Sequence, residues 1–309
     1  MRTKLKKVGK FLIKLVVSLF FIYLILQKVN WQEALVYLKR VTPGNLVVYV
    51  VIILAAMVIS AIKWRMLAVF KGFHGSFMKY FKLYLTGAFI NNFVPSTIGG
   101  DVFRAYQIGK EEKRYFESTA AVVVDRFTGL ISLMVMAPIF ALLNFERVKS
   151  SPVILALSLA MAGLLVAFLL FLWMRKYAWM KKIAGYLPEK VKVFLRELNS
   201  FHNDPKIFLQ AMGYSFAFNL FGVALANYIL FWSLSVPVNL FDYLSVIFLI
   251  SVISSIPAGV GLKEWSYITL FGFWGINPAA VAMVAILNRF LQALVNLVAL
   301  PIYLKNKKD

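Results

Sequence analysis

The sequence Asn91-Asn92-Phe93-Val94-Pro95-Ser96-Thr97-Ile98-Gly99-Gly100-Asp101 ends a short apolar run, Leu83–Val94. At twelve residues, this run is shorter than the roughly 20 residues that a helix needs to cross the hydrocarbon core of a bilayer. Proline removes a backbone donor, and glycine permits backbone conformations that other residues avoid. The pattern predicts a broken helix whose released backbone groups need a polar setting enclosed by protein.

A second short apolar run, Leu244–Ile256, ends in the same way. It continues as Ser254-Ser255-Ile256-Pro257-Ala258-Gly259-Val260-Gly261-Leu262-Lys263-Glu264, again with a glycine four residues after the proline. Each break is followed by an arginine in a later apolar run. The spacing from Pro95 to Arg126 and the spacing from Pro257 to Arg289 differ by a single position, and a proline lies twelve residues beyond each arginine. The repetition predicts a duplicated unit.

The composition indicates an integral membrane protein. Of 309 residues, 61% are hydrophobic and 15% are charged, which leaves too little polar surface to coat a soluble domain. Residues 11–26 are interpreted as a retained first span, because the bulky, polar sequence after them offers no signal-peptide cleavage site. Five further stretches are long enough to cross a bilayer: 46–69, 118–143, 152–174, 207–233 and 279–304.

Positive charges decide between two topologies. If both short runs crossed the membrane, Lys and Arg would divide almost equally, 15 on the cytoplasmic side and 16 outside, against the positive-inside rule. If both runs turned back as hairpins, 25 would lie inside and 6 outside, with Lys14, Arg126 and Arg289 within spans. The hairpin arrangement is favoured and predicts cytoplasmic termini.

The predicted fold is an all-α integral membrane protein with six spanning helices and two re-entrant helical hairpins. The whole chain, 1–309, forms one polytopic membrane domain with two repeats, about 11–143 and about 152–304. Each repeat contains two spans, a hairpin and a third span. Because three crossings is an odd number, the second repeat must be inverted relative to the first, as in many secondary transporters.

Two surface segments have an amphipathic pattern. Residues 175–206 carry eight Lys and Arg and space Val191, Phe194, Leu195 and Leu198 along one helix face, which predicts a basic helix on the cytoplasmic surface. Residues Trp31, Ala34, Leu35 and Leu38 repeat the spacing on the other side. Both segments are interpreted mainly as anchors for the fold.

Several kinds of chemistry are disfavoured. The chain has no cysteine, and its two histidines, His74 and His202, are far apart in the sequence and have no ligand partners nearby, so neither a metal site nor thiol chemistry is expected. No Gly-x4-Gly-Lys-Ser/Thr loop is present for nucleotide hydrolysis. The net charge of +21 lies in short clusters between apolar runs, which fits anionic lipid rather than nucleic acid. No cofactor is expected.

The charged residues inside apolar segments are the candidate substrate-binding set. An arginine at the centre of a span costs roughly 2.5–3.5 kcal/mol on insertion scales, so Arg126 and Arg289 are expected to face the interior. Neighbours on a helix point about 100° apart, so Asp125 is not expected to pair well with Arg126. Partners are expected from the hairpins, Asp101 and Arg104 in the first and Lys263 and Glu264 in the second.

This set has two interpretations. It forms either a polar cavity where cations and helix N-termini receive a phosphate, or internal ion pairs that hold the hairpins in place. Asn91, Asn92 and Ser96 satisfy backbone groups at the first break or contact a headgroup. Pro95, Gly99, Gly100, Pro257, Gly259 and Gly261 are the expected hairpin and hinge residues.

The residues quoted above resemble a known family. Asn91–Tyr106, Asp125-Arg126 and Pro257–Glu264 are similar to the lysylphosphatidylglycerol synthase transmembrane region, the flippase-like domain of the multiple peptide resistance factor and of many stand-alone bacterial and archaeal proteins. The resemblance covers nearly the whole chain and implies movement of a phosphate-bearing lipid between leaflets. It also points to Asp101, Arg104, Asp125, Arg126 and Glu264. In two-domain synthases a soluble domain follows the last span; here the sequence stops at Asp309, so synthase activity is not expected.

The first functional hypothesis is a flippase for an anionic or aminoacylated phospholipid, or for a polyprenyl-phosphate-linked lipid, in the plasma membrane of a bacterium or archaeon. A membrane transferase acting on lipid phosphates is the alternative, although the sequence has no Asp-x-Asp pair. A noncatalytic scaffold for a separate lipid-modifying enzyme is the third. Membrane lipids are the expected partners, and a homo-oligomer is compatible with the sequence.

Overall fold

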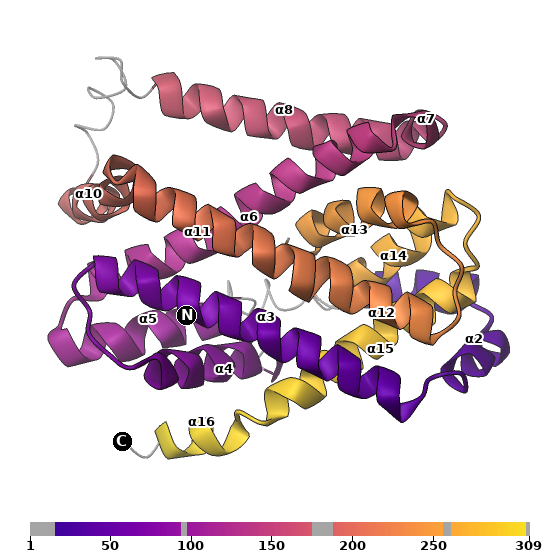
Figure 1. The fold of residues 1–309 in the computed structure, drawn as a ribbon, viewed down its shortest axis with the longest axis horizontal. Helices are drawn as coiled ribbons and strands as arrows, with labels where there is room; N and C mark the ends of the chain where they lie inside the picture. The colour runs from indigo at the N-terminus through magenta and orange to yellow at the C-terminus, as the bar shows by residue number, and fades with distance from the viewer. Residues whose placement is uncertain (1–15, 94–97, 175–187, 256–260, 307–309) are drawn as a thin grey trace. The chain divides into compact units, whose positions relative to one another are not determined.

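The structure is a computed structural model that describes residues 16–93, 98–174, 188–255 and 261–306. Within these residues the chain is helical and has no β-strand (Figure 1). An apolar helix, Val16–Lys28, comes first. It is followed by α2 (Trp31–Leu38), α3 (Pro43–Phe70), α4 (Phe77–Phe93), α5 (Gly99–Glu112), α6 (Tyr115–Leu143), α7 (Phe145–Val148), α8 (Pro152–Met174), α10 (Glu189–Asn203), α11 (Pro205–Phe218), the π-helix η1 (Asn219–Leu225), α12 (Ala226–Ser233), α13 (Leu240–Ser254), α14 (Leu262–Gly272), α15 (Pro278–Leu297) and α16 (Leu300–Asn306).

Five helical segments are long and apolar enough to cross a membrane. They are α3, α6, α8 over Pro152–Leu170, the continuous run Pro205–Ser233 made of α11, η1 and α12, and α15. These segments confirm the five long predicted stretches, and the chain is a multi-pass integral membrane protein. The first predicted span, 11–26, lies partly outside the described residues.

Four of these segments begin with proline at the first helical position, namely at Pro43, Pro152, Pro205 and Pro278. Proline suits this position because the first N–H groups of a helix have no partner within it. The residue before the proline caps the helix in three cases: Thr42 Oγ1 accepts from Asn45 N at 3.4 Å, Asp204 Oδ1 accepts from Ile207 N at 3.1 Å, and Asn277 Oδ1 accepts from Ala279 N at 2.8 Å.

Each short apolar run belongs to a pair of packed helices. Helix α4 begins at Phe77, six residues before the predicted run, and α5 packs against it after the break. Helix α13 begins at Leu240 and packs against α14 after the second break. The two α4–α5 and α13–α14 pairs are the helical hairpins of the structure.

The chain divides into two compact units, and each contains one hairpin. Unit 1 comprises Met1–Tyr49, Met136–Leu159 and Val223–Phe290, and unit 2 comprises Val50–Val135, Ala160–Gly222 and Leu291–Asp309. Each unit therefore takes segments from both predicted repeats. Unit 1 contains the α13–α14 hairpin with the first part of α15, and unit 2 contains the α4–α5 hairpin with the first part of α6.

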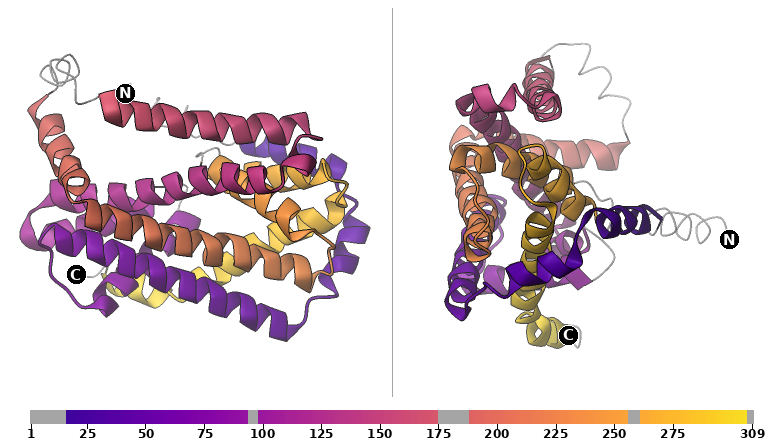
Figure 2. Two further views of the ribbon diagram at one scale, coloured as in Figure 1. Left: turned by 45° about the horizontal axis from the view of Figure 1, so that its top comes forward. Right: turned by 90° about the vertical axis from the view of Figure 1, so that its right-hand side faces the viewer.

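Each unit has an aromatic core. In unit 1, the ring of Phe231 lies 5.4 Å from that of Tyr243 and 4.8 Å from that of Phe271. In unit 2, Phe201 of α10 is buried in the core, and Phe194 and Leu198 pack against it. The apolar face of α10 therefore anchors this helix to unit 2, as the sequence predicted, although Val191 and Leu195 stay exposed. Figure 2 shows α10 next to the start of α11. The rest of the basic segment, 175–187, lies outside the described residues.

Candidate functional site

The α4–α5 hairpin is held together by a very close approach of two glycines. A Cβ atom added to Gly100 would lie 1.9 Å from the carbonyl oxygen of Gly87, so only glycine fits there. Asn91 Oδ1 accepts a hydrogen bond from Gly100 N at 2.8 Å and so satisfies a backbone donor at the start of α5. Gly100 was expected as a hinge residue, and the structure shows that it is required for close packing. Pro95 and Ser96 lie outside the described residues.

A chain of alternating charges links three helices of unit 2. Lys63 Nζ in α3 lies 3.0 Å from Asp125 Oδ1 in α6, and Arg104 in α5 donates to Asp125 Oδ2 at 3.2 Å. Arg104 also donates to Asp101 Oδ1 at 2.7 Å. Arg126 Nε lies 2.9 Å from Asp101 Oδ2, and its NH2 group donates to Oδ1 at 3.0 Å. As predicted, the hairpin supplies partners for both charges of α6, Arg104 for Asp125 and Asp101 for Arg126, but Asp125 also pairs with Lys63 of α3.

Arg104 is the buried centre of this network. Its guanidinium lies over the ring of Trp64 at 4.7 Å and over that of Tyr84 at 5.0 Å, and its side chain is almost fully buried. Aromatic faces attract cations, and they do so more strongly where water is excluded. Two carboxylates and two rings therefore compensate for the burial of this charge.

Arg126 is far more accessible than the other members of the network. Its side chain is 57% exposed, although the sequence predicted that it faces the interior. Two of its five N–H groups face Asp101, and the other three find no partner among the described residues. Because a charge in lipid is costly, these donors are expected to face water or a polar ligand.

Arg126 lines a cavity of about 170 Å³ in unit 2. The cavity is formed by residues of α4, α5, α6 and α15: Tyr84, Gly87, Ala88, Asn91, Asn92, Arg104, Arg126 and Asn296. Asn296 was not predicted. The residue is 4% exposed, and its Oδ1 atom has no hydrogen-bond partner within the described part of the chain. A buried amide oxygen without a partner inside a cavity indicates a place for a ligand or a water molecule.

The second hairpin, in unit 1, has a smaller version of the network. Gly261 has a φ of 102°, which glycine adopts readily, and its N–H donates to Glu264 Oε2 at 3.1 Å. Arg289 Nε lies 2.8 Å from Glu264 Oε1, and the arginine side chain is 43% exposed. Lys263 interacts electrostatically with Glu264 and Arg289. Pro257 and Gly259 lie outside the described residues.

The two networks match in position as well as in chemistry. Asp101 and Glu264 are each the third residue of the helix after the break, and Arg126 and Arg289 are each the twelfth residue of the following long helix. The sequence separation of Asp101 and Arg126 equals that of Glu264 and Arg289. The two units therefore contain the same acid–arginine pair.

The residue before each arginine differs between the units. Asp125 pairs with Lys63, whereas Asn288 Oδ1 accepts from the hydroxyl of Tyr49 at 2.6 Å. Neither of these partners from α3 was predicted, and Lys63 was counted among the charges of the cytoplasmic loop. A lysine three quarters of the way along a 28-residue apolar helix was the signal that could have identified this pair.

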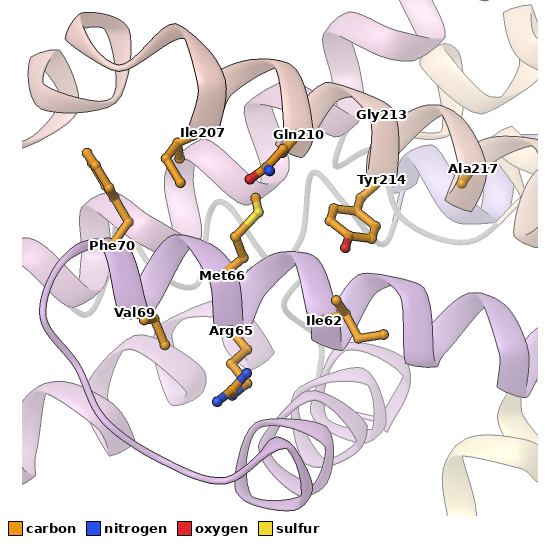
Figure 3. Close-up of a pocket in the computed structure, with 10 residues that line it drawn as sticks. All are labelled: Ile62, Arg65, Met66, Val69, Phe70, Ile207, Gln210, Gly213, Tyr214 and Ala217. Atoms are coloured by element: carbon orange, nitrogen blue, oxygen red, sulfur yellow. The ribbon is translucent and has the colours of Figure 1, made fainter.

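A larger cavity, about 800 Å³, lies between α3 and α11 of unit 2. Figure 3 shows Met66 of α3 and Gln210 and Tyr214 of α11 pointing into the space between the two helices, while Arg65 points away from it. Its other lining residues are Ile62, Val69, Phe70, Ile207, Gly213 and Ala217. This largely apolar groove suits hydrocarbon better than a charged group, so the smaller cavity is the candidate headgroup site.

Fold and charged sites define the class of the molecule as a multi-pass helical membrane protein with two charged helical hairpins. Comparison with known proteins identifies the family. The profile of the family described as "Lysylphosphatidylglycerol synthase TM region" matches residues 11–299, and the chain belongs to this family.

Two archaeal relatives are similar along most of their length. A UPF0104 membrane protein of Methanocaldococcus jannaschii is 27% identical over 92% of this chain and 90% of its own. A UPF0104 membrane protein of Methanothermobacter thermautotrophicus is 24% identical over 82% of each chain. No solved structure matches this chain.

Proposed function

We propose that the protein moves a lipid with a phosphate-bearing headgroup between the leaflets of the plasma membrane. The observation that carries this proposal is the position of Arg126 beside a polar cavity in a membrane-crossing helix, where three of its N–H groups have no partner among the described residues. Guanidinium groups bind phosphate oxygens strongly through charge-assisted hydrogen bonds. The family name supports a role in lipid chemistry.

In this mechanism the headgroup and the acyl chains take different paths. The phosphate binds Arg126 in the cavity of about 170 Å³. Hydrogen bonds from Arg126 replace some of those that the phosphate loses when it leaves water. The acyl chains stay in hydrocarbon, and the groove between α3 and α11 offers them an apolar surface. Asp101 holds the guanidinium in place, so the donors are oriented before the lipid arrives.

The proposed topology has six spans, two re-entrant hairpins entering from opposite sides, an inverted repeat and cytoplasmic termini. The matched Asp101–Arg126 and Glu264–Arg289 pairs support the repeat. A rocking movement of one repeat against the other would expose the lipid site first to one leaflet and then to the other.

A transferase is less well supported than a flippase. General base catalysis needs a carboxylate or another base that can reach a substrate proton. Asp101, Asp125 and Glu264 are each engaged by an arginine, a lysine or a backbone N–H in the structure. All three carboxylates are therefore occupied by structural partners.

Leaflet-resolved lipid labelling in reconstituted vesicles tests the proposal. A fluorescent anionic phospholipid is placed in both leaflets, and an impermeant reductant added outside destroys the accessible half of the signal. If the protein moves lipid between leaflets, the reductant is expected to destroy well over half of the fluorescence. A new lipid species in the vesicles would indicate a transferase, and an unchanged half signal without any new lipid would leave the scaffold hypothesis.

A further inference from the structure

The cavity around Arg126 has chemistry that discriminates between headgroups. Its charged network contains three cations, Lys63, Arg104 and Arg126, and two carboxylates, Asp101 and Asp125. One positive charge is left over, and Arg126 is the cation that is exposed at the cavity. A single excess charge matches a phosphodiester, which carries one negative charge, better than a phosphate monoester, which carries close to two at neutral pH.

Both carboxylates of the network are already occupied. Asp101 Oδ1 accepts from Arg104 and Arg126, and its Oδ2 lies 2.9 Å from Arg126 Nε. Asp125 faces Lys63 with one oxygen and Arg104 with the other. Residues 94–97, Val-Pro-Ser-Thr, lie outside the described structure and contain no acid in their sequence. The described lining of the cavity therefore offers no carboxylate to an ammonium group.

The remaining polar groups of the cavity are neutral. They are the amides of Asn91, Asn92 and Asn296 and the hydroxyl of Tyr84. The buried Asn296 oxygen needs a donor, which a ligand hydroxyl provides without adding charge. An ammonium would also donate, but it would bring a second positive charge close to Arg126 without a counter-ion. Like charges that come close together repel each other, and the repulsion grows as water is excluded between them.

The hairpin of unit 1 also contains an acid whose oxygens are both engaged. Glu264 uses one oxygen for Arg289 and the other for Gly261 N. Among the described residues, Arg289 is the cation that forms an ion pair with Glu264. Both units thus place an exposed arginine beside an engaged acid.

On the basis of the proposed function, we infer that the cavity of unit 2 takes a singly charged phosphodiester lipid whose headgroup carries neutral hydroxyls, and that it rejects headgroups bearing an ammonium. Aminoacylated lipid is therefore not the substrate of this protein, although the family description names a lysylated lipid. In this arrangement Arg126 contacts the phosphate, and Asn91, Asn92 and Asn296 contact the hydroxyls.

A direct test compares phosphatidylglycerol with lysylphosphatidylglycerol of the same acyl composition, because these lipids differ only in the lysyl ester. Binding to the purified full chain in detergent is measured by native mass spectrometry with both lipids in competition. We expect phosphatidylglycerol to be preferred at least about tenfold, since an unpaired charge near Arg126 costs more than one charged hydrogen bond. Equal or better binding of the lysyl lipid, or no binding of either, overturns the inference.

The vesicle assay separates this inference from the proposed function. If phosphatidylglycerol binds with preference but neither lipid crosses the bilayer, the proposed transport fails and the headgroup selectivity stands. If both lipids cross at equal rates, transport stands and the selectivity fails. Glycerophosphoglycerol, the same headgroup without acyl chains, is expected to compete at least about tenfold more weakly. Equal competition would identify a water-soluble phosphodiester and overturn the assignment to a lipid.

Adding a carboxylate to the cavity should reverse the preference. Asn296→Asp and, at the exposed rim, Asn92→Asp are each expected to improve binding of the lysyl lipid relative to phosphatidylglycerol about tenfold. Asn45→Asp is the matched control, because it makes the same substitution near the start of α3, outside the cavity, and should keep the wild-type preference. If the cavity variants do not fold, the wild-type competition still decides. Unchanged selectivity in folded Asn296→Asp and Asn92→Asp would contradict the inference.

Discussion

Lys63 Nζ lies 3.0 Å from Oδ1 of Asp125, and both side chains are almost fully buried. The lysine also donates to the backbone carbonyl oxygen of Asp125 at 2.8 Å and to Ser215 Oγ at 3.0 Å. A buried pair with this many hydrogen bonds connects α3, α6 and α11 within unit 2. It also determines the charge balance of the network that reaches Arg126, because without Lys63 the network would have no excess positive charge.

Removing Lys63 should therefore affect stability. Lys63→Met leaves Asp125 with one cation instead of two, and loss of one member of a buried pair typically costs about 3 kcal/mol or more. We expect a clear loss of thermal stability in detergent, followed by intrinsic fluorescence. Asp125→Asn in the same chain should recover part of that loss, since it removes the acid left with one cation. Additive effects of the two substitutions would argue against the pair.

Substitutions at Arg126 test whether this residue has a structural or a functional role. Arg126→Ala removes the donors that face the cavity and is expected to reduce transbilayer lipid movement at least about tenfold, the value of one charged hydrogen bond. Arg126→Lys keeps the charge, but lysine has no planar guanidinium that can bind both Asp101 and a phosphate. The rate of lipid movement by this variant should therefore lie between that of the wild type and that of Arg126→Ala. The measurement is the vesicle assay at equal amounts of reconstituted protein. Failure of both variants to accumulate in membranes would assign a structural role to Arg126.

The long helices were predictable because each depends on a local property of the sequence. Apolar runs of about 20 residues with a proline at the start need no knowledge of tertiary structure. The ends of α4 at Phe93 and of α13 at Ser254 were likewise visible, because proline and glycine follow runs too short to span.

The pairs within the site could be predicted only in part. Asp101 and Arg126 are close in sequence, and the cost of a charge in lipid was sufficient reason to expect a partner from the hairpin. Lys63 and Asp125 are 62 residues apart in the sequence, and Tyr49 and Asn288 are 239 residues apart. Their formation depends on how α3 packs in each unit, which the pattern of a single helix does not contain. The position of Asn296 in the cavity likewise depends on tertiary packing that the sequence pattern does not show.

Gly100 gives a test of the hairpin itself. Gly100→Ala would place a methyl group 1.9 Å from the carbonyl oxygen of Gly87, so α4 and α5 would have to separate. Overpacking of this kind costs about 3 kcal/mol, and we expect a marked fall in the melting temperature of the purified protein. Gly163→Ala in α8 is the control, because, apart from the backbone of its own helix, no atom of the described residues lies within 4 Å of the added carbon. The control should be neutral or slightly stabilising. Equal behaviour of the two variants would show that the close contact is absent.

The inverted arrangement of the hairpins can be tested directly because the chain has no cysteine. Ser96→Cys and Ala258→Cys place single thiols in the two breaks, both outside the described residues. If the hairpins enter from opposite sides, an impermeant maleimide added to intact vesicles of one orientation should label one variant, and labelling of the other should require opened vesicles. Asn30→Cys and Asn306→Cys mark the two faces in the proposed topology and calibrate the assay. Labelling of both hairpin thiols from a single side would contradict the inverted repeat and leave the acid–arginine pairs as a coincidence of sequence.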